Sequence, residues 1–248
     1  MASQEAIREL KKSSFSWYDN LKKDNSKLYD ILLGVKDSLD YTVFRLVPDR
    51  LFVKLQYRLL TGKHLNLKKP VSFNEKLQWL KLNQRTDLSM LVDKYRVKKY
   101  VSEKLGSAYV FPTLGVWDKY QDIDFSKLPE KFVLKTTHDS GGIVICRNKA
   151  DFNNQEAEKL LNKHLRRNYY WHAREFAYKN VPPRIIAEPY MQDESEDGLK
   201  DYKVFCFDGV PKVIQVDFDR FSDHKRNLYT ADWTYIPAQI KYKCSPEE

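Results

Sequence analysis

A lysine followed by a short polar loop is the part of the sequence best suited to chemistry. Lys135 ends the apolar segment 131–135 and is followed by a loop that closes with Ser140, Gly141 and Gly142. A fixed positive charge beside backbone N–H groups that no side chain shields can hold a polyphosphate. The spacing is not that of a P-loop, GxxxxGK[ST], so we do not expect that class of site. Taken alone, these residues also fit an ordinary hairpin turn.

Two further groups of charged residues could complete such a site. Glu188 ends an apolar segment and is followed by Pro189 and Tyr190, so its carboxylate and the nearby backbone could bind an adenine edge or a ribose hydroxyl. Asp201 and Lys203 are two residues apart in a predicted strand and should lie on one face of it. The pair could hold a nucleotide phosphate or form a surface ion pair, and the sequence leaves both open.

The composition excludes several classes of protein. The chain has 248 residues and a formal net charge of +9, and no apolar run approaches the roughly 18 residues that span a bilayer. The N-terminus lacks the apolar stretch of a signal peptide, so we expect a cytoplasmic protein. Cys146, Cys206 and Cys244 are too far apart for a disulfide framework or a CxxC metal site. The positive charge fits nucleic acid, an anionic membrane surface or an anionic small substrate, and composition does not choose among them.

The elements that must position these residues begin with a helical region over residues 1–85. Apolar residues between 28 and 39 have helical spacing, and a second helix is predicted over 48–60, with Gly62 as its end. Ser72 and Glu75 form a capping box, which predicts a third helix starting there.

From Asp93 onward, helices and strands alternate. The predicted elements are a helix over 93–105, strands over 131–135 and 143–146, a long helix over 154–170, a strand over 184–188, and a hairpin of 201–207 and 211–217 that turns at Asp208-Gly209.

Two further groups of residues have side chains that could form a site. Arg174 and Glu175 are interpreted as a surface pair or as substrate residues. A zinc site is not expected, because the histidines lack the spacing of zinc ligands.

The order of these motifs resembles the ATP-grasp superfamily. The resemblance rests on the segments 93–101, 132–135 with 138–142, 186–190 and 201–207. The segments 72–81 and 215–221 are similar to the TupA-like branch in particular. The similarity covers about residue 45 to the end of the chain.

The resemblance implies an α+β fold in which two lobes with antiparallel sheets grip ATP, preceded by the N-terminal helical region. It implies domains of 1–85, 86–187 and 188–248, with ATP and Mg²⁺ as cofactors. The implied activity is a carboxylate–amine ligase that forms an acyl phosphate during bacterial capsule or surface polysaccharide synthesis. Its partners would be a small-molecule or glycan carboxylate and an amine, with no specific nucleic acid. A peripheral contact with the membrane's inner face or with polysaccharide-synthesis enzymes is left open.

The resemblance also assigns roles to individual residues. Lys135, Arg220 and Arg226 would serve catalysis, and Asp217, Asp219 and Lys225 would meet the substrate. The nucleotide would be bound by Lys94, Lys135, Ser140, Gly141, Gly142, Glu188, Tyr190, Asp201 and Lys203.

The sequence departs from the family pattern in two places. The late carboxylates that hold Mg²⁺ in ATP-grasp ligases are missing, so the second lobe is expected to be shortened and the metal ligands are unknown. The loop also has Asp139 after His138, where the family would have glycine, which adds a negative charge beside the expected phosphates. Two alternatives therefore remain: a glycan kinase or other glycan-modifying transferase, and a non-catalytic protein that binds anionic glycan or nucleic acid.

Overall fold

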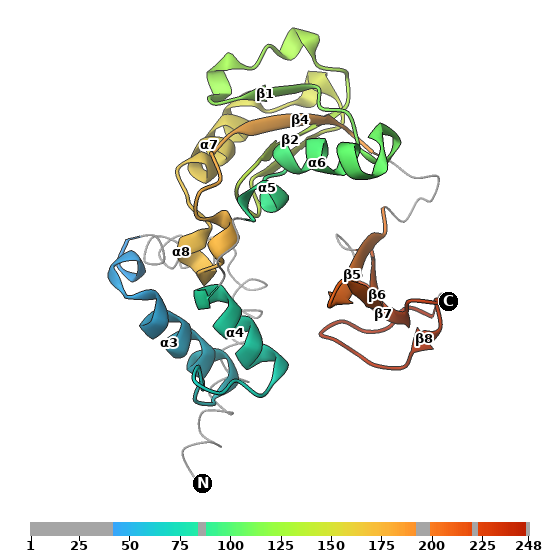
Figure 1. Ribbon diagram of the computed structural model, residues 1–248. Helices are drawn as coiled ribbons and strands as arrows, with labels where there is room; N and C mark the ends of the chain where they lie inside the picture. The colour runs from blue at the N-terminus through green and yellow to red at the C-terminus, as the bar shows by residue number, and fades with distance from the viewer. Residues whose placement is uncertain (1–41, 84–87, 192–198, 220–222, 247–248) are drawn as a thin grey trace. The chain divides into compact units, whose positions relative to one another are not determined.

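The computed structural model describes residues 42–83, 88–191, 199–219 and 223–246. The chain forms two compact units, Met1–Pro189 and Tyr190–Glu248, and each is described by itself. Figure 1 shows a helical layer and a sheet in the first unit and a second sheet in the other. The helix predicted between residues 28 and 39 lies outside the described residues.

Two helices side by side make up the helical layer, α3 over Asp49–Thr61 and α4 over Phe73–Asn83 (Figure 1). α3 turns Phe52, Val53 and Tyr57 inward, where they pack with Leu65 and Leu67 of the following segment. It ends at Gly62, whose φ of 73° is in the left-handed region that glycine adopts without strain. The sequence-based prediction of this helix is confirmed to within a residue.

The capping box at the start of α4 is formed as predicted. The backbone N–H of Glu75 donates to Ser72 Oγ at 3.3 Å, and the backbone N–H of Ser72 donates to Glu75 Oε2 at 2.9 Å. These two bonds satisfy backbone N–H groups that have no partner within the first helical turn. The pKa of Glu75 is lowered, chiefly by the bond from the Ser72 backbone.

Arg174 joins the helical layer to the rest of the first unit. Its guanidinium is fully buried and donates to the carbonyl oxygens of Phe44 at 2.5 Å and Val47 at 3.2 Å, and its Nε lies 2.8 Å from Asp49 Oδ1. The interpretation of Arg174 and Glu175 as a surface pair is therefore wrong for Arg174. A buried charge must be paired and hydrogen-bonded, and here the chain's own backbone meets that need.

The first sheet is antiparallel, with strand order β1-β4-β2-β3. On one face, Phe132 and Leu134 of β2 pack with Ala157 and Leu161 of the helix α7 in the main core of the unit. The other face carries Lys135, because successive residues of a strand point to opposite sides. The strands are β1 over Gly115–Trp117, β2 over Phe132–Thr136, β3 over Ile143–Cys146 and β4 over Ile185–Pro189.

The helices of this unit differ from the prediction most clearly over 154–170, and the helix predicted over 93–105 begins three residues later, at Arg96. The helix predicted over 154–170 ends early: α7 covers Asn154–Leu165, and a separate short helix, α8, covers Tyr170–Ala173. The Asn168 side chain accepts a hydrogen bond from the backbone N–H of Tyr170 at 3.0 Å, which starts the new turn and competes with a continuous helix. The remaining helices are α5 over Ser89–Val92 and α6 over Arg96–Leu105, with short 3₁₀ turns at Phe44–Leu46, Ser107–Tyr109, Tyr120–Asp122, Phe125–Lys127, Lys149–Asp151 and Phe176–Tyr178.

The second unit is an antiparallel sheet with strand order β5-β6-β7-β8. Asp208 and Gly209 have φ values of 51° and 78° and form the predicted tight turn between the first two strands. The apolar face holds Ile214, Val216, Phe218 and Tyr229. The strands are β5 over Asp201–Phe207, β6 over Val210–Phe218, β7 over Lys225–Thr230 and β8 over Tyr235–Ile236. The mixed α+β fold with antiparallel sheets is confirmed.

Within the described residues, no helix has both the length and the apolar character needed to cross a bilayer.

Candidate functional site

The face of the first sheet opposite α7 carries a centre of one carboxylate and three lysines. Lys135 of β2 lies diagonally from Glu188 of β4, because the register pairs Val133 with Glu188 and Lys135 with Ile186. Lys135 Nζ donates to Glu188 Oε2 at 2.5 Å. Glu188 is largely buried, with 12% of its side chain exposed, whereas Lys135 keeps 31% exposed. We call Glu188 with Lys94, Lys98 and Lys135 the Glu188 centre.

Lys98 is a member of this centre that the sequence analysis missed. It comes from α6 and forms an ion pair with Glu188 Oε1, and it also donates to the carbonyl oxygen of Phe111 and to Thr113 Oγ1, both at 3.1 Å. One signal for it exists in the sequence, since Lys98 follows the predicted nucleotide residue Lys94 by four positions, the spacing of neighbours on a helix face.

Glu188 stays ionised because of its two lysines. Burial by itself raises the pKa of this carboxyl, but the hydrogen bonds from Lys135 and Lys98 act more strongly in the opposite direction, and the pKa is lowered overall. One negative charge is thus shared by two positive ones. The sharing leaves the centre with excess positive charge.

Lys94 adds a third amino group to this excess. Its Nζ donates to the carbonyl oxygens of Thr136 at 2.9 Å and of Asp139. Burial lowers the pKa of Lys94, and the positive charge of Lys135 lowers it further, while Asp139 acts in the opposite direction. The carboxylates of Asp93 and Glu188 also raise this pKa, but burial outweighs them. A bound anion would stabilise the charged form of Lys94 further.

Asp93 fixes the backbone that carries Lys94. Its fully buried carboxylate accepts from the backbone N–H groups of Tyr95 at 2.9 Å and Arg96 at 3.2 Å, as the capping residue of a helix does. The other carboxylate oxygen accepts from Arg184 Nη2 at 2.9 Å, just before β4. The start of α6 is therefore tied to the strand that carries Glu188.

The loop after β2 is anchored through the residue that departs from the family pattern. Asp139 is buried and bonds His164 Nδ1 of α7, and it also accepts from the backbone N–H of Ser140 at 2.6 Å. Burial raises the pKa of Asp139, but these bonds outweigh it, so the pKa is lowered. The sequence predicts this negative charge beside the phosphates. The structure instead turns it inward as an anchor.

The two glycines of the loop occupy different surroundings. Gly141 is exposed, with a φ of 96° that favours glycine. Gly142 is buried, and a Cβ there would lie 2.2 Å from Thr136 Oγ1 and 3.0 Å from the His164 side chain. The loop therefore needs glycine at position 142 for space, because its backbone runs against β2 and α7. Ser140 is exposed beside them.

An apolar surface adjoins the lysines on the same face. The strand registers place Val133, Ile143, Ile145 and Ile186 next to Lys135 and Glu188. Ile143 and Ile145 are partly exposed because they belong to the edge strand β3. Such a surface beside cations can accept a flat uncharged ring next to an anionic group.

A groove of about 540 Å³ follows the free edge of β3 and the start of α7. It is lined by residues 143–148 and by positions between 151 and 160. None of the four charged residues of the Glu188 centre lines it. We therefore do not assign the chemistry to this groove.

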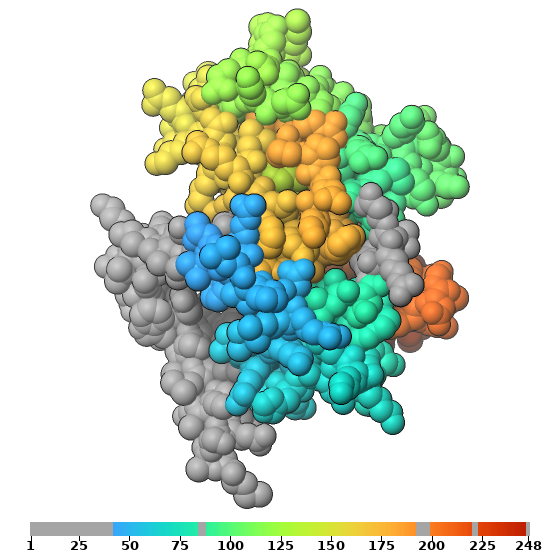
Figure 2. All heavy atoms as spheres, turned by 60° about the vertical axis from the view of Figure 1, so that its left-hand side comes forward, coloured from blue at the N-terminus to red at the C-terminus, as the bar shows by residue number. Residues whose placement is uncertain are grey.

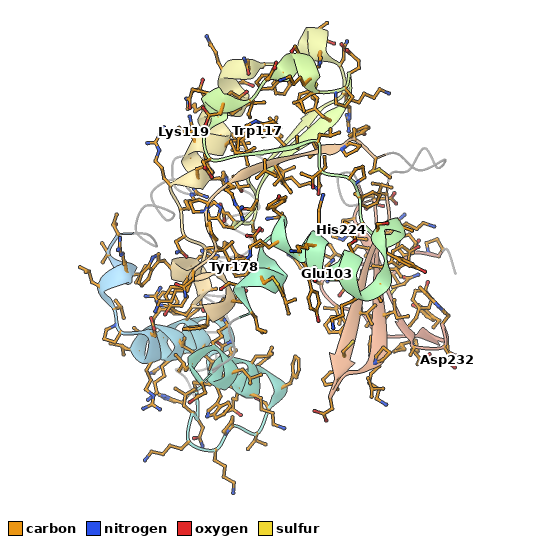
Figure 3. The ribbon with its side chains drawn as sticks, turned by 45° about the horizontal axis from the view of Figure 1, so that its top comes forward. Glu103, Trp117, Lys119, Tyr178, His224 and Asp232 are labelled. Carbon is orange, nitrogen blue, oxygen red and sulfur yellow. The ribbon has the colours of Figure 1, made fainter. Side chains whose placement is uncertain are left out.

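The second unit has its own charged cluster, built around Asp217 of β6. Asp217 is 1% exposed and accepts from Lys203 Nζ at 2.5 Å, Gln215 Nε2 at 2.9 Å and Arg226 Nε at 2.5 Å, and His224 Nε2 lies 3.2 Å away. Figure 3 labels His224 in this unit. Burial raises the pKa of Asp217, but the donors outweigh it, Arg226 foremost, and hold the pKa far below its usual range. We call these five residues the Asp217 cluster.

The other predicted residues of the second unit are placed as follows. Lys203 lies 4.0 Å from Asp201, so Asp217 is its nearer partner. Lys225 points to the opposite face from Arg226 and lies 3.5 Å from Asp223. Asp219 follows β6 with a φ of 48°. Tyr190 is partly buried, and Arg220 lies outside the described residues.

The described residues fit ATP but do not fit Mg²⁺. In the described ranges of both units, no group of three or more His, Cys, Asp or Glu side chains could hold a metal. Glu188, Asp139 and Asp217 are each engaged by cationic or hydrogen-bonding partners, so these residues do not form a metal site of their own. The Glu188 centre does fit the phosphates of ATP, because it has excess positive charge and a loop without side chains at two positions.

Comparison with known proteins gives one match. A family model described as TupA-like ATPgrasp matches residues 75–248, which is more than two thirds of the chain. The matched region contains every residue of the Glu188 centre and of the Asp217 cluster, whereas α3 precedes it. No curated protein and no solved structure matches the chain significantly.

Proposed function

Since the chain belongs to the TupA-like ATP-grasp family, we propose that it is an ATP-dependent carboxylate–amine ligase whose nucleotide phosphates bind at the Glu188 centre. Membership of the family supports ATP binding and a ligase-type enzyme. The carboxylate, the amine and a role in capsule or surface polysaccharide synthesis are further parts of the proposal.

The excess positive charge of the Glu188 centre is the main support for this proposed function. Two lysines share Glu188, and the pKa of a third lysine, Lys94, is lowered by burial and by the charge of Lys135. Phosphoryl transfer to a carboxylate brings two anions together. Cations that the protein holds in place before the reaction therefore make a large contribution to its rate. Lys135 is more exposed than Lys98, the other lysine bonded to Glu188, and is therefore the main residue that we assign to the phosphates.

The proposed reaction has two steps. A carboxylate oxygen of the substrate attacks the γ-phosphorus of ATP, ADP leaves, and an acyl phosphate forms. The amine then attacks the acyl carbon, and phosphate leaves. Lys135 and Lys98 would hold phosphate oxygens, the loop 140–142 would cover them with backbone N–H groups, and the apolar surface beside Lys135 would take the adenine ring.

Roles in the second unit remain part of the proposal. Asp201 and Lys203 are assigned to the nucleotide, Asp217, Asp219 and Lys225 to the substrate, and Arg220 and Arg226 to catalysis. In the described part of this group, Lys203 and Arg226 both bond Asp217, so they already form one cluster.

A turnover assay tests this function. The chain is incubated with Mg-ATP, a panel of uronic acids and a panel of amino acids, and release of ADP and phosphate is measured. A ligase releases both only when an acid and an amine are present together. Lys135→Met should abolish the release, and the matched variant Lys131→Met, an exposed lysine four residues earlier, should keep it.

Two results would contradict the ligase proposal. A stable phosphorylated product without phosphate release would indicate a kinase. Turnover that persists unchanged in Lys135→Met would place the chemistry away from the Glu188 centre.

A further inference from the structure

The positive charge of the chain is concentrated in its helical layer. Residues 42–83 contain nine Lys or Arg and two Asp or Glu, a net charge of +7 out of +9 for the whole chain. Residues 1–41 contain seven of each sign and are neutral. A field of this kind attracts anionic partners to one part of the molecule.

The outer side of α3 combines this charge with exposed leucines. Leu51, Leu55 and Leu59 are spaced four residues apart and so line one side of the helix, with exposed fractions of 50%, 47% and 74%. Leu46, just before the helix, is 84% exposed, and Leu60 is 73% exposed. These side chains are not needed for the core, because Phe52, Val53 and Tyr57 form the inward side.

A row of cations runs beside the leucines. Arg50, Lys54 and Arg58 each precede a leucine of the row by one position, and all three are exposed. The helix has one acidic residue, Asp49, which is engaged by Arg174 and Tyr170 on the inner side. In Figure 2 this helix, drawn in blue, lies on the face turned to the viewer.

We propose that this side of α3 binds the surface of an anionic lipid bilayer. The cations would meet lipid phosphates while the leucines enter the boundary between headgroups and acyl chains. Nucleic acid or an acidic glycan would satisfy the cations but would leave the leucines in water. An anionic bilayer surface offers phosphates to the cations and acyl chains to the leucines. This contact needs no membrane-spanning helix.

The length and anchoring of α3 suit such a contact. A helix of 13 residues is about 20 Å long, enough to lie in the interface but not to cross it. Its inner side stays bound to its own unit through Asp49 and Arg174. α4 also exposes Phe73, Leu77 and Leu80 and could extend the apolar contact. This contact with the bilayer requires neither ATP binding nor ligase activity.

Co-sedimentation with vesicles tests the proposal. The full chain is mixed with vesicles of phosphatidylcholine alone or with added phosphatidylglycerol, and bound protein is measured. We expect binding only with phosphatidylglycerol and a loss of binding as salt is raised. The variant with Arg50, Lys54 and Arg58 changed to Gln should bind on the order of 100-fold more weakly, since each cation near an anionic surface contributes severalfold.

Matched variants separate this contact from general charge. Changing Lys119, Lys131 and Lys159 to Gln removes three exposed cations elsewhere in the first unit and should leave binding within about twofold; Lys119 is labelled in Figure 3. Changing Leu51, Leu55 and Leu59 to Gln keeps every charge and should also weaken binding. The thermal midpoints of all variants are measured first, and exposed positions should leave them unchanged.

Three results would overturn the proposal. The first is no binding to anionic vesicles. The second is an equal loss of binding in the α3 charge variant and in the variant of Lys119, Lys131 and Lys159. That result would show that binding depends on the overall charge and not on this side of α3. The third concerns the leucine variant. Normal binding would show that the leucines do not contact lipid, and a much lower stability than the parent would show that the chain's own residues 1–41, rather than lipid, cover them.

Discussion

The two charged groups of this protein use a carboxylate in opposite ways. In the Glu188 centre, one carboxylate serves two lysines, a third lysine is held nearby by backbone carbonyls, and Lys135 keeps about a third of its surface exposed. In the Asp217 cluster, one fully buried carboxylate is surrounded by donors from three strands. The first arrangement has positive charge to spare. The second has its negative charge fully satisfied.

This difference indicates which group can accept a ligand by itself. An anion at the Glu188 centre would relieve the repulsion among its lysines, whereas displacing Asp217 would leave Arg226 and Lys203 without their shared partner. Asp217 is therefore best described as the residue that holds the cations of the second sheet in position. Lys203, which is about half exposed, remains able to turn toward a ligand.

The largest expected effect is on stability, from Asp217→Ala. Removing this buried carboxylate should lower the free energy of unfolding by about 3 kcal/mol, because Arg226 and Lys203 lose their charged partner. Urea unfolding measures the loss. Asp223→Ala removes an exposed carboxylate paired with Lys225 and should cost no more than about 0.5 kcal/mol. Equal losses would remove the distinction between a satisfied cluster and a surface pair.

Gly142→Ala should have the next largest effect and tests the loop of the Glu188 centre. The added Cβ would lie 2.2 Å from Thr136 Oγ1, so the loop must shift, at a cost of roughly 1–3 kcal/mol in unfolding free energy. Thermal and urea unfolding measure this cost. The double variant with Thr136→Ala removes the clashing oxygen and should recover part of the loss. If the double variant is less stable than Gly142→Ala, the space argument is wrong.

Glu188→Gln should have the smallest effect on stability, about 1 kcal/mol at neutral pH, because Lys135 can turn to solvent. The pKa of Glu188 is lowered by its lysines, so the folded state binds fewer protons than the unfolded state and the ionised form is stabilising. This contribution is complete above the unfolded pKa of about 4.3 and is lost as pH falls through the folded pKa. Parent and variant should therefore converge in urea unfolding below about pH 4. A gap that widens toward acid would reverse the sign of the argument.

Features set by neighbouring residues could be predicted from the sequence. The capping box of Ser72 and Glu75, the end of α3 at Gly62 and the turn at Asp208 and Gly209 all depend on contacts within four residues, and all are present. The strands that carry Lys135 and Glu188 were also predicted from apolar runs. Their pairing across the sheet, which brings the two side chains together, was not.

Features that depend on distant parts of the chain could not be predicted. The spacing of Lys98 from Lys94 places the two on one predicted helix face, but only the fold brings Lys98 to Glu188. The anchoring of Asp139 depends on His164, which is 25 positions later. Arg174 meets Phe44 about 130 positions earlier, so its burial has no local signal.

The thermal midpoint with and without Mg-ATP tests the central claim most directly, because a ligand that binds the folded state raises stability by RT ln(1 + [L]/Kd). The parent and Lys131→Ala should both shift upward with Mg-ATP, and Lys135→Ala should not. An equal shift in Lys135→Ala, or no shift in the parent, would contradict a nucleotide site at the Glu188 centre.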